Sequence, residues 1–135
     1  MKANIILICF FISASLYSQE QKTVEIIQAG KSIRNSIEYP DANILQKDKN
    51  LRVILFHDGA RIESDVSYYY FNENSFKANG EVNFNQGDSL LLTSDFLEYD
   101  GKTKKAIAFG NVKLTRPDMK LETDTLYLDR PRNIA

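Results

Sequence analysis

Hydrophobic and polar residues alternate with a period of two along much of the chain, as in strands that bury one face. The alternation is strict at 81–85, where Glu, Val, Asn, Phe and Asn follow one another, and it places Val82 and Phe84 on the buried face. Residues 111–115 repeat the same pattern. Residues 51–56 form instead a nearly continuous apolar run, which is typical of a strand covered on both faces.

Two of these segments repeat each other at an interval of 30 residues. Gly80 begins the series Gly-Glu-Val-Asn-Phe, and Gly110 begins Gly-Asn-Val-Lys-Leu. A similar interval relates three aspartates, Asp65, Asp95 and Asp124. A period of this size indicates one supersecondary unit that buries its apolar face by stacking on its neighbours. Because no helix signal separates the units, the sequence predicts an all-β fold.

The phase of the alternation changes at the aspartate of each unit. In the unit that contains Asp95, the apolar positions are even-numbered around Leu92 but odd-numbered at Leu97 and Tyr99. One extra residue in a strand is a β-bulge, which bends the strand. We therefore predict bulges or corners at the three aspartates. Single acids a whole unit apart do not converge on a calcium ion, so we expect their carboxylates to accept hydrogen bonds from backbone amides at the bends.

The first 18 residues have the features of a secretory signal peptide. An apolar run at 5–16 follows a short basic start and precedes a small residue at position 18. The run is shorter than the roughly 20 residues that span a bilayer, which favours a cleaved leader over a membrane anchor. We expect 1–18 to be removed and 19–135 to form one domain. Cys9, the only cysteine, lies in the leader behind a bulky isoleucine, so a lipoprotein is not expected.

The composition offers little for catalysis or nucleic-acid binding. The 17 Lys and Arg residues nearly balance the 18 Asp and Glu residues, which excludes the electrostatic surface that nucleic acids require. His57 is the only histidine and stands beside Asp58, with no serine or cysteine nucleophile motif nearby. We expect no catalytic site, no metal site and no cofactor. The absence of tryptophan disfavours a glycan-binding jelly roll.

Several cations gather late in the sequence, at turns and strand ends. They are Lys102, Lys104, Lys105, Arg116, Lys120, Arg130 and Arg132. Such residues could contact the phosphates of a lipid headgroup. They could equally be solvated turn residues that keep edge strands from aggregating, and the sequence favours this second interpretation.

The ordered series of motifs resembles the OstA/LptA family of periplasmic lipopolysaccharide-transport proteins, in detail its OstA-like branch. The matching segments are 57–60, 80–88, 97–101, 110–114 and 121–126. The resemblance implies an open, twisted β-jelly roll, here built from strand-pair repeats of about 30 residues, whose subunits join edge to edge. Because members of this branch are commonly longer, we expect the domain to be truncated at its C-terminus.

The implied activity is to shelter the acyl chains of lipopolysaccharide in an apolar groove while the molecule crosses the periplasm. The groove candidates are Val82, Phe84, Leu97, Tyr99, Val112, Leu114, Leu126 and Leu128. The implied partners are the lipid A acyl chains and, through edge strands, other Lpt-type jelly rolls or a second copy. The alternative is a structural β-repeat scaffold of the cell envelope that binds no lipid, in which the same residues are only a core.

Overall fold

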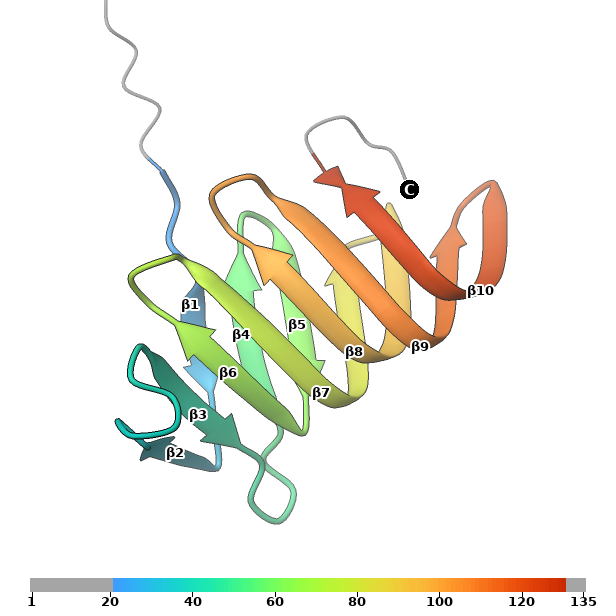
Figure 1. The fold of residues 1–135 in the computed structure, drawn as a ribbon. Helices are drawn as coiled ribbons and strands as arrows, with labels where there is room; N and C mark the ends of the chain where they lie inside the picture. The colour runs from blue at the N-terminus through green and yellow to red at the C-terminus, as the bar shows by residue number, and fades with distance from the viewer. Residues whose placement is uncertain (1–20, 131–135) are drawn as a thin grey trace, which may run out of the picture.

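The regular structure of the chain is β throughout the part that the computed structural model describes, residues 21–130. The strands are β1 (Glu25–Gln28), β2 (Lys31–Arg34), β3 (Ala42–Gln46), β4 (Val53–His57), β5 (Ala60–Ser64), β6 (Val66–Tyr70), β7 (Ser75–Gln86), β8 (Leu90–Asp100), β9 (Lys105–Arg116) and β10 (Met119–Asp129). Every pairing is antiparallel, and the strands form one curled sheet (Figure 1). The all-β prediction is confirmed. The expected leader and Arg132 lie outside the described residues.

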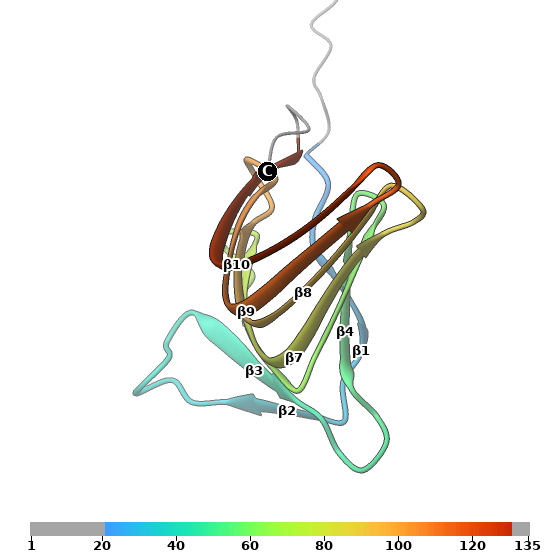
Figure 2. The ribbon, with the colours of Figure 1, turned by 90° about the vertical axis from the view of Figure 1, so that its right-hand side faces the viewer.

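The sheet folds into two arms because each of the long strands β7 to β10 bends once near its middle (Figure 2). One half of each long strand continues the sheet of β2, β3 and β6, which we call the β6 arm. The other half continues the sheet of β1, β4 and β5, which we call the β5 arm. We call the region between the arms, which inward side chains fill, the trough; the bends form its floor, and the turns at the strand ends form its mouth.

The bends lie where the phase of the sequence pattern changes. Register shifts separate Asn79 from Val82 on β7, Thr93 from Phe96 on β8, and Thr123 from Thr125 on β10. Between β5 and β6 the chain turns at Asp65, which belongs to neither strand. Corners predicted at the three aspartates are therefore confirmed.

Glycines in the following strand fit against two of these corners, those at Asp65 and Asp95. Gly80 and Gly110 adopt φ angles of 82° and 78°, a region that L-residues rarely enter. A Cβ atom on Gly80 would lie 2.8 Å from the Cβ of Asp65, and one on Gly110 would lie 2.7 Å from Oδ2 of Asp95. Thus the thirty-residue repeat preserves a glycine and an aspartate that fit against each other across neighbouring strands.

The side chains of Asp65 and Asp95 have other partners than we expected from the sequence. The carboxylate of Asp65 pairs with Nζ of Lys47 at 2.9 Å and with Nε of Arg52 at 3.5 Å. The carboxylate of Asp95 accepts a hydrogen bond from Nδ2 of Asn111 at 2.8 Å. The prediction of backbone amide donors is wrong here, because the positive-φ corners bring side chains within reach. Within residues 21–130, no group of three or more potential metal-ligating side chains forms.

The edge strands at the two ends of the sheet run in the same directions. At one end, β1 runs toward the floor of the trough and β2 runs back toward the mouth; at the other end, the two halves of β10 do the same. This follows from strand count, since each arm contains seven antiparallel segments, so the first and the last point the same way. No helix in residues 21–130 is long and apolar enough to cross a membrane.

Candidate functional site

The apolar lining of the trough is built from rows of directly paired residues that cross the strands. On the β5 arm one row contains Ile26, Leu55, Ile62, Phe84, Leu92, Leu114 and Leu121. Cross-strand partners share a face of the sheet, so the whole row faces the trough. Its five middle members are at most 1% exposed, whereas Ile26 and Leu121 are 43% and 37% exposed. The row is therefore covered along its length and uncovered at both ends.

The β6 arm faces the trough with two rows, of which the parts on β6 to β10 are named here. One contains Ser67, Ala78, Leu97, Ala108 and Leu126, and the other contains Tyr69, Phe76, Tyr99, Ala106 and Leu128. On β6 and β7 the small residues Ser67 and Ala78 of one row lie next to the aromatic residues Tyr69 and Phe76 of the other, so that the side chains interdigitate. The ring of Tyr99 stacks on that of Phe76, with the ring centres 5.2 Å apart, and its centre lies 6.1 Å from the ring centre of Phe84 on the opposite arm. The arms thus meet in the middle, and side chains fill the trough there.

All eight groove candidates from the sequence lie on the inner face and are buried. Val82, Phe84, Val112 and Leu114 come from the β5 arm, and the other four come from the β6 arm. They belong to a single hydrophobic cluster. Their orientation follows from the alternation and the bulges together; their contact with lipid stays a prediction. The same alternation could have identified Ile62, Leu92 and Phe76, which sequence reasoning did not select.

A buried histidine links the two arms at the mouth of the trough. His57, the last residue of β4, is 1% exposed. Its Nε2 lies 2.9 Å from the carbonyl oxygen of Lys22, and its Nδ1 lies 2.7 Å from the hydroxyl of Tyr99. Because a carbonyl only accepts, Nε2 carries a proton and donates it to the Lys22 carbonyl, while Nδ1 forms a hydrogen bond with the hydroxyl of Tyr99. Both ring nitrogens are thereby engaged in holding the fold, which accounts for the histidine without catalysis.

Arg130 reaches across the same mouth from the end of β10. Its guanidinium donates to the carbonyl of Asp58 at 2.7 Å, to the hydroxyl of Tyr99 at 2.8 Å and to Oε1 of Gln86 at 3.1 Å. The guanidinium carbon also lies 5.7 Å from the centre of the Phe84 ring, within range of a cation–π contact. Arg130 therefore joins the β6 arm to the β4–β5 turn of the β5 arm.

The carboxylate of Asp58 collects two further cations at this point. Oδ1 accepts from Nζ of Lys22 at 2.5 Å, and Oδ2 accepts from Nζ of Lys104 in the β8–β9 turn. Hydrogen bonds from Lys104 and then Lys22 hold the pKa of Asp58 well below its usual range. Burial raises the pKa of the nearby Tyr99 hydroxyl. The interpretation of Lys104 and Arg130 as solvated turn residues is wrong, since both bind groups of the opposite arm.

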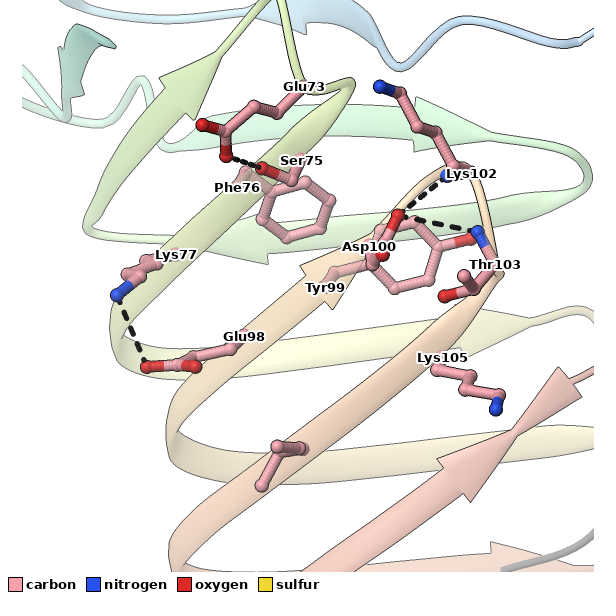
Figure 3. Close-up of a pocket in the computed structure, with 11 residues that line it drawn as sticks. Glu73, Ser75, Phe76, Lys77, Glu98, Tyr99, Asp100, Lys102, Thr103 and Lys105 are labelled. Atoms are coloured by element: carbon pink, nitrogen blue, oxygen red, sulfur yellow. Dashed lines mark hydrogen bonds and ion pairs between the residues drawn. The ribbon is translucent and has the colours of Figure 1, made fainter. Parts of the chain in front are cut away.

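A pocket of about 610 Å³ lies at the rim of the β6 arm (Figure 3). Its polar lining mixes both charges: Lys77 pairs with Glu98 at 3.5 Å, and Oδ1 of Asp100 accepts the backbone amides of Lys102 and Thr103. Because acids and lysines alternate around the rim, the pocket favours neither anions nor cations. We therefore take the trough and its mouth, and not this pocket, as the candidate site.

The comparisons with known proteins agree with this geometry. A profile of the OstA-like protein family matches residues 21–135. The chain belongs to the OstA-like family. Among solved structures, the fold of this OstA-like chain is similar to LptH from Pseudomonas aeruginosa, the LptA-homologous periplasmic component of a lipopolysaccharide transport device. The TM-score is 0.69 at 11% identity, over 84% of this chain and 80% of LptH. No curated protein matches significantly.

The likeness to LptH confirms the predicted jelly-roll fold. At 11% identity few side chains are shared, so the likeness of fold rests on a feature that many different side chains can provide, the two-residue alternation of apolar and polar positions. The polar contacts of His57 at the mouth, by contrast, depend on its imidazole side chain.

Proposed function

We propose that the chain is a periplasmic, non-enzymatic module that shelters the acyl chains of lipopolysaccharide against its inner face and joins similar modules edge to edge. The observation that carries this proposal is the row of the β5 arm that ends in exposed Ile26 and Leu121. A closed core would cover its ends. An apolar row that is open at both ends fits a continuous path through several modules.

Acyl chains gain free energy wherever they cover exposed apolar surface, at about 0.8 kcal/mol for each buried CH₂ group. The uncovered inner side chains at the β10 end are Met119 and Leu121. Entry is therefore proposed at β10. Deeper residues such as Phe84 and Leu97 are packed by the opposite arm, so chains reach them only when the arms part. The eight groove candidates are assigned to this inner path.

The sheet ends support head-to-tail assembly. Because β10 runs in the same directions as β1 and β2, β10 of one copy meets β1 and β2 of the next in parallel pairing. Such strand addition satisfies the free main-chain groups of an edge. On the β5 arm, this places Leu121 beside Ile26 and makes the inner row continuous from one copy to the next.

The outer face of the β6 arm sets the register of this join. One outward row contains Ile33, Ile44, Tyr68, Lys77, Glu98, Ile107 and Tyr127. Its two end residues, Ile33 on β2 and Tyr127 on β10, are exposed large hydrophobic residues. Extending the row into a second copy brings Tyr127 against Ile33. A cysteine at each position is expected to give a ladder of disulfide-linked oligomers upon oxidation, and the single variants are expected to give none.

The periplasmic location is supported by the expected signal peptide and by the likeness to LptH, which is itself a periplasmic protein. We propose that residues 1–18 are a cleaved leader and that residues 19–135 form the mature domain. Secretion is tested by sequencing the N-terminus of the protein recovered from a periplasmic extract.

Photo-crosslinking in living cells tests the lipid path. A probe at Leu121, which faces the trough and is already exposed, is compared with one at its neighbour Glu122, which faces outward on the same strand. A second pair is Leu97 and Glu98. Lipopolysaccharide adducts are expected at Leu121, and at Leu97 if the arms part, but not at the two glutamates.

Adducts with protein alone at every position would refute lipid transport. That outcome would favour the scaffold alternative, in which the filled trough around Phe84 is an ordinary core and only the edges act. Equal lipid labelling at Leu121 and Glu122 would also refute the proposal, because it would indicate unspecific contact with membrane lipid.

A further inference from the structure

Three cationic side chains meet at Asp58 at the mouth of the trough. Lys22 and Lys104 bind the two oxygens of Asp58, and Arg130 donates to the backbone carbonyl of the same residue. We call these four residues the mouth cluster. Within these four residues one negative charge stands against three positive charges, a sum of +2. The chain as a whole carries a net charge of −1, so this local excess is not a property of the overall composition.

The two lysines have hydrogen-bonding capacity left. Each ammonium group carries three N–H donors, and the acceptor found for each of the two lysines is one oxygen of the Asp58 carboxylate. The side chain of Lys22 is 67% exposed and that of Lys104 is 38% exposed, so a group from solvent can approach both. An anion with several oxygens would satisfy more of these donors than one carboxylate does.

The mouth cluster lies directly above apolar residues of the trough. Arg130 contacts the Phe84 ring on one side and the Tyr99 hydroxyl on another, and both aromatic residues belong to the inner rows. An amphiphile that places its chain against these rows brings its polar headgroup to the level of Arg130. A cationic group at the boundary between an apolar trough and water selects for amphiphiles with a negative headgroup.

We propose that the mouth cluster is a binding site for a phosphate group carried by an amphiphile whose chain lies in the trough. The proposal rests on the proposed function for the position of the chain, and it adds the recognition of the headgroup. In this arrangement Asp58 holds the place of the phosphate in the free protein. The phosphate displaces the Asp58 carboxylate from Lys22 and Lys104, and this exchange loosens one of the links between the arms.

The low pKa of Asp58 supports this view, because it reports how strongly the two lysines stabilise a negative charge at that point. Removing that charge leaves the lysines without a counterion. The variant Asp58→Asn is therefore expected to bind phosphate more tightly. Asparagine suits the backbone, since position 58 has a φ of 47° and precedes Gly59, and Asn-Gly is a favoured turn pair.

The experiment measures the affinity of the purified protein for two probes that differ only by a phosphate. Myristoyl lysophosphatidate carries the phosphate, and monomyristoyl glycerol has the same chain without it. Both are titrated below their micelle concentrations against the natural protein, Asp58→Asn and the double variant K22Q/K104Q. The matched control is K77Q/K113Q, which removes the same charge from two outer-face ion pairs.

The natural protein is expected to prefer the lysophosphatidate. K22Q/K104Q is expected to weaken its binding about tenfold, as for loss of charge-assisted hydrogen bonds, and to leave the neutral probe unchanged. Asp58→Asn is expected to strengthen lysophosphatidate binding several-fold, whereas K77Q/K113Q changes neither probe. The opposite signs matter, because a merely structural role of the Asp58 cluster would make both mouth variants bind more weakly.

Two outcomes would refute the phosphate site but leave the proposed function intact. One is equal affinity of the natural protein for both probes, and the other is weaker lysophosphatidate binding in Asp58→Asn. Failure of both probes to bind any variant, together with the absence of lipopolysaccharide crosslinks, would remove the proposed function itself. Inorganic phosphate serves as a competitor. It is expected to compete far less well than the lysophosphatidate, and equal competition would show an anion site unrelated to amphiphiles.

Discussion

Replacing Gly110 by alanine tests whether the corners of the long strands depend on the fit between glycine and aspartate. Gly110 and Gly59 have nearly the same positive φ angle, 78° and 82°. Their surroundings differ. A Cβ on Gly59 would have no atom within 4 Å, whereas one on Gly110 would lie 2.7 Å from Oδ2 and 2.9 Å from the Cβ of Asp95. Gly59→Ala is therefore a matched control.

The two variants share the cost of placing alanine in the left-handed region, roughly 1–2 kcal/mol. They also share a small gain of about 0.4–1 kcal/mol from the stiffer unfolded chain. Gly110→Ala adds an overpacking cost, typically about 1–3 kcal/mol. The carboxylate of Asp95 can turn away, but its Cβ cannot move without the strand. We expect Gly110→Ala to lose about 2 kcal/mol more unfolding free energy than Gly59→Ala.

Urea denaturation followed by circular dichroism and tyrosine fluorescence gives the two unfolding free energies, since the chain has seven tyrosines and no tryptophan. The double variant D95G/G110A removes the Asp95 Cβ that the new methyl group at position 110 would meet. A double-mutant cycle is expected to recover most of the additional loss. Equal losses in Gly110→Ala and Gly59→Ala, or no coupling with position 95, would refute the role assigned to this contact.

Three further perturbations test other parts of the structure. Leu121→Glu is expected to abolish capture of a fluorescent fatty acid with little loss of stability, because Leu121 is 37% exposed. Leu97→Glu is expected to unfold the protein, because Leu97 is 1% exposed and a glutamate there would bury a charge. Thermal melts together with binding assays separate the two effects. Since the folded pKa of Asp58 is lowered, its ion pairs stabilise the protein above the unfolded value of about 4, and this contribution is lost as the pH falls below it. Melting temperatures from pH 7 to pH 2 are therefore expected to fall more steeply in the natural protein than in Asp58→Asn, and parallel curves would contradict the assignment. His57→Phe roughly keeps the ring volume but leaves the Tyr99 hydroxyl and the Lys22 carbonyl without this partner, an expected loss of about 2 kcal/mol that urea denaturation measures.

The sequence predicted the inner face well because burial and alternation are local properties of a strand. The phase change at Asp95 was sufficient to place the corner between Leu92 and Leu97, and both residues face the trough. The partner of Asp95 could not be predicted. Its carboxylate meets Asn111, sixteen residues away, because both φ angles at Gly110 and Asn111 are positive, and such conformations depend on how neighbouring strands pack.

Contacts across the mouth were beyond sequence reasoning for a related reason. His57 and Tyr99 are 42 residues apart and Arg130 lies 73 residues from His57, so their meeting depends on how far each strand bends. Nothing local distinguishes Arg130 from a solvated arginine. The family resemblance implied the roll and its edges, but it carried no information about which polar groups close the mouth.

The contacts across the mouth and the packed interior together constrain how a lipid could enter. The rings of Phe84 and Tyr99 meet between the arms, and His57 and Arg130 connect the arms above them. A chain of apolar groups inserted from the side must break these polar links, each worth about 1 kcal/mol or more. A chain that slides in from the β10 end, past exposed Leu121, breaks none of them at first. Entry along the axis of the roll is thus favoured over entry through the mouth, and it is the direction in which head-to-tail assembly would extend the path.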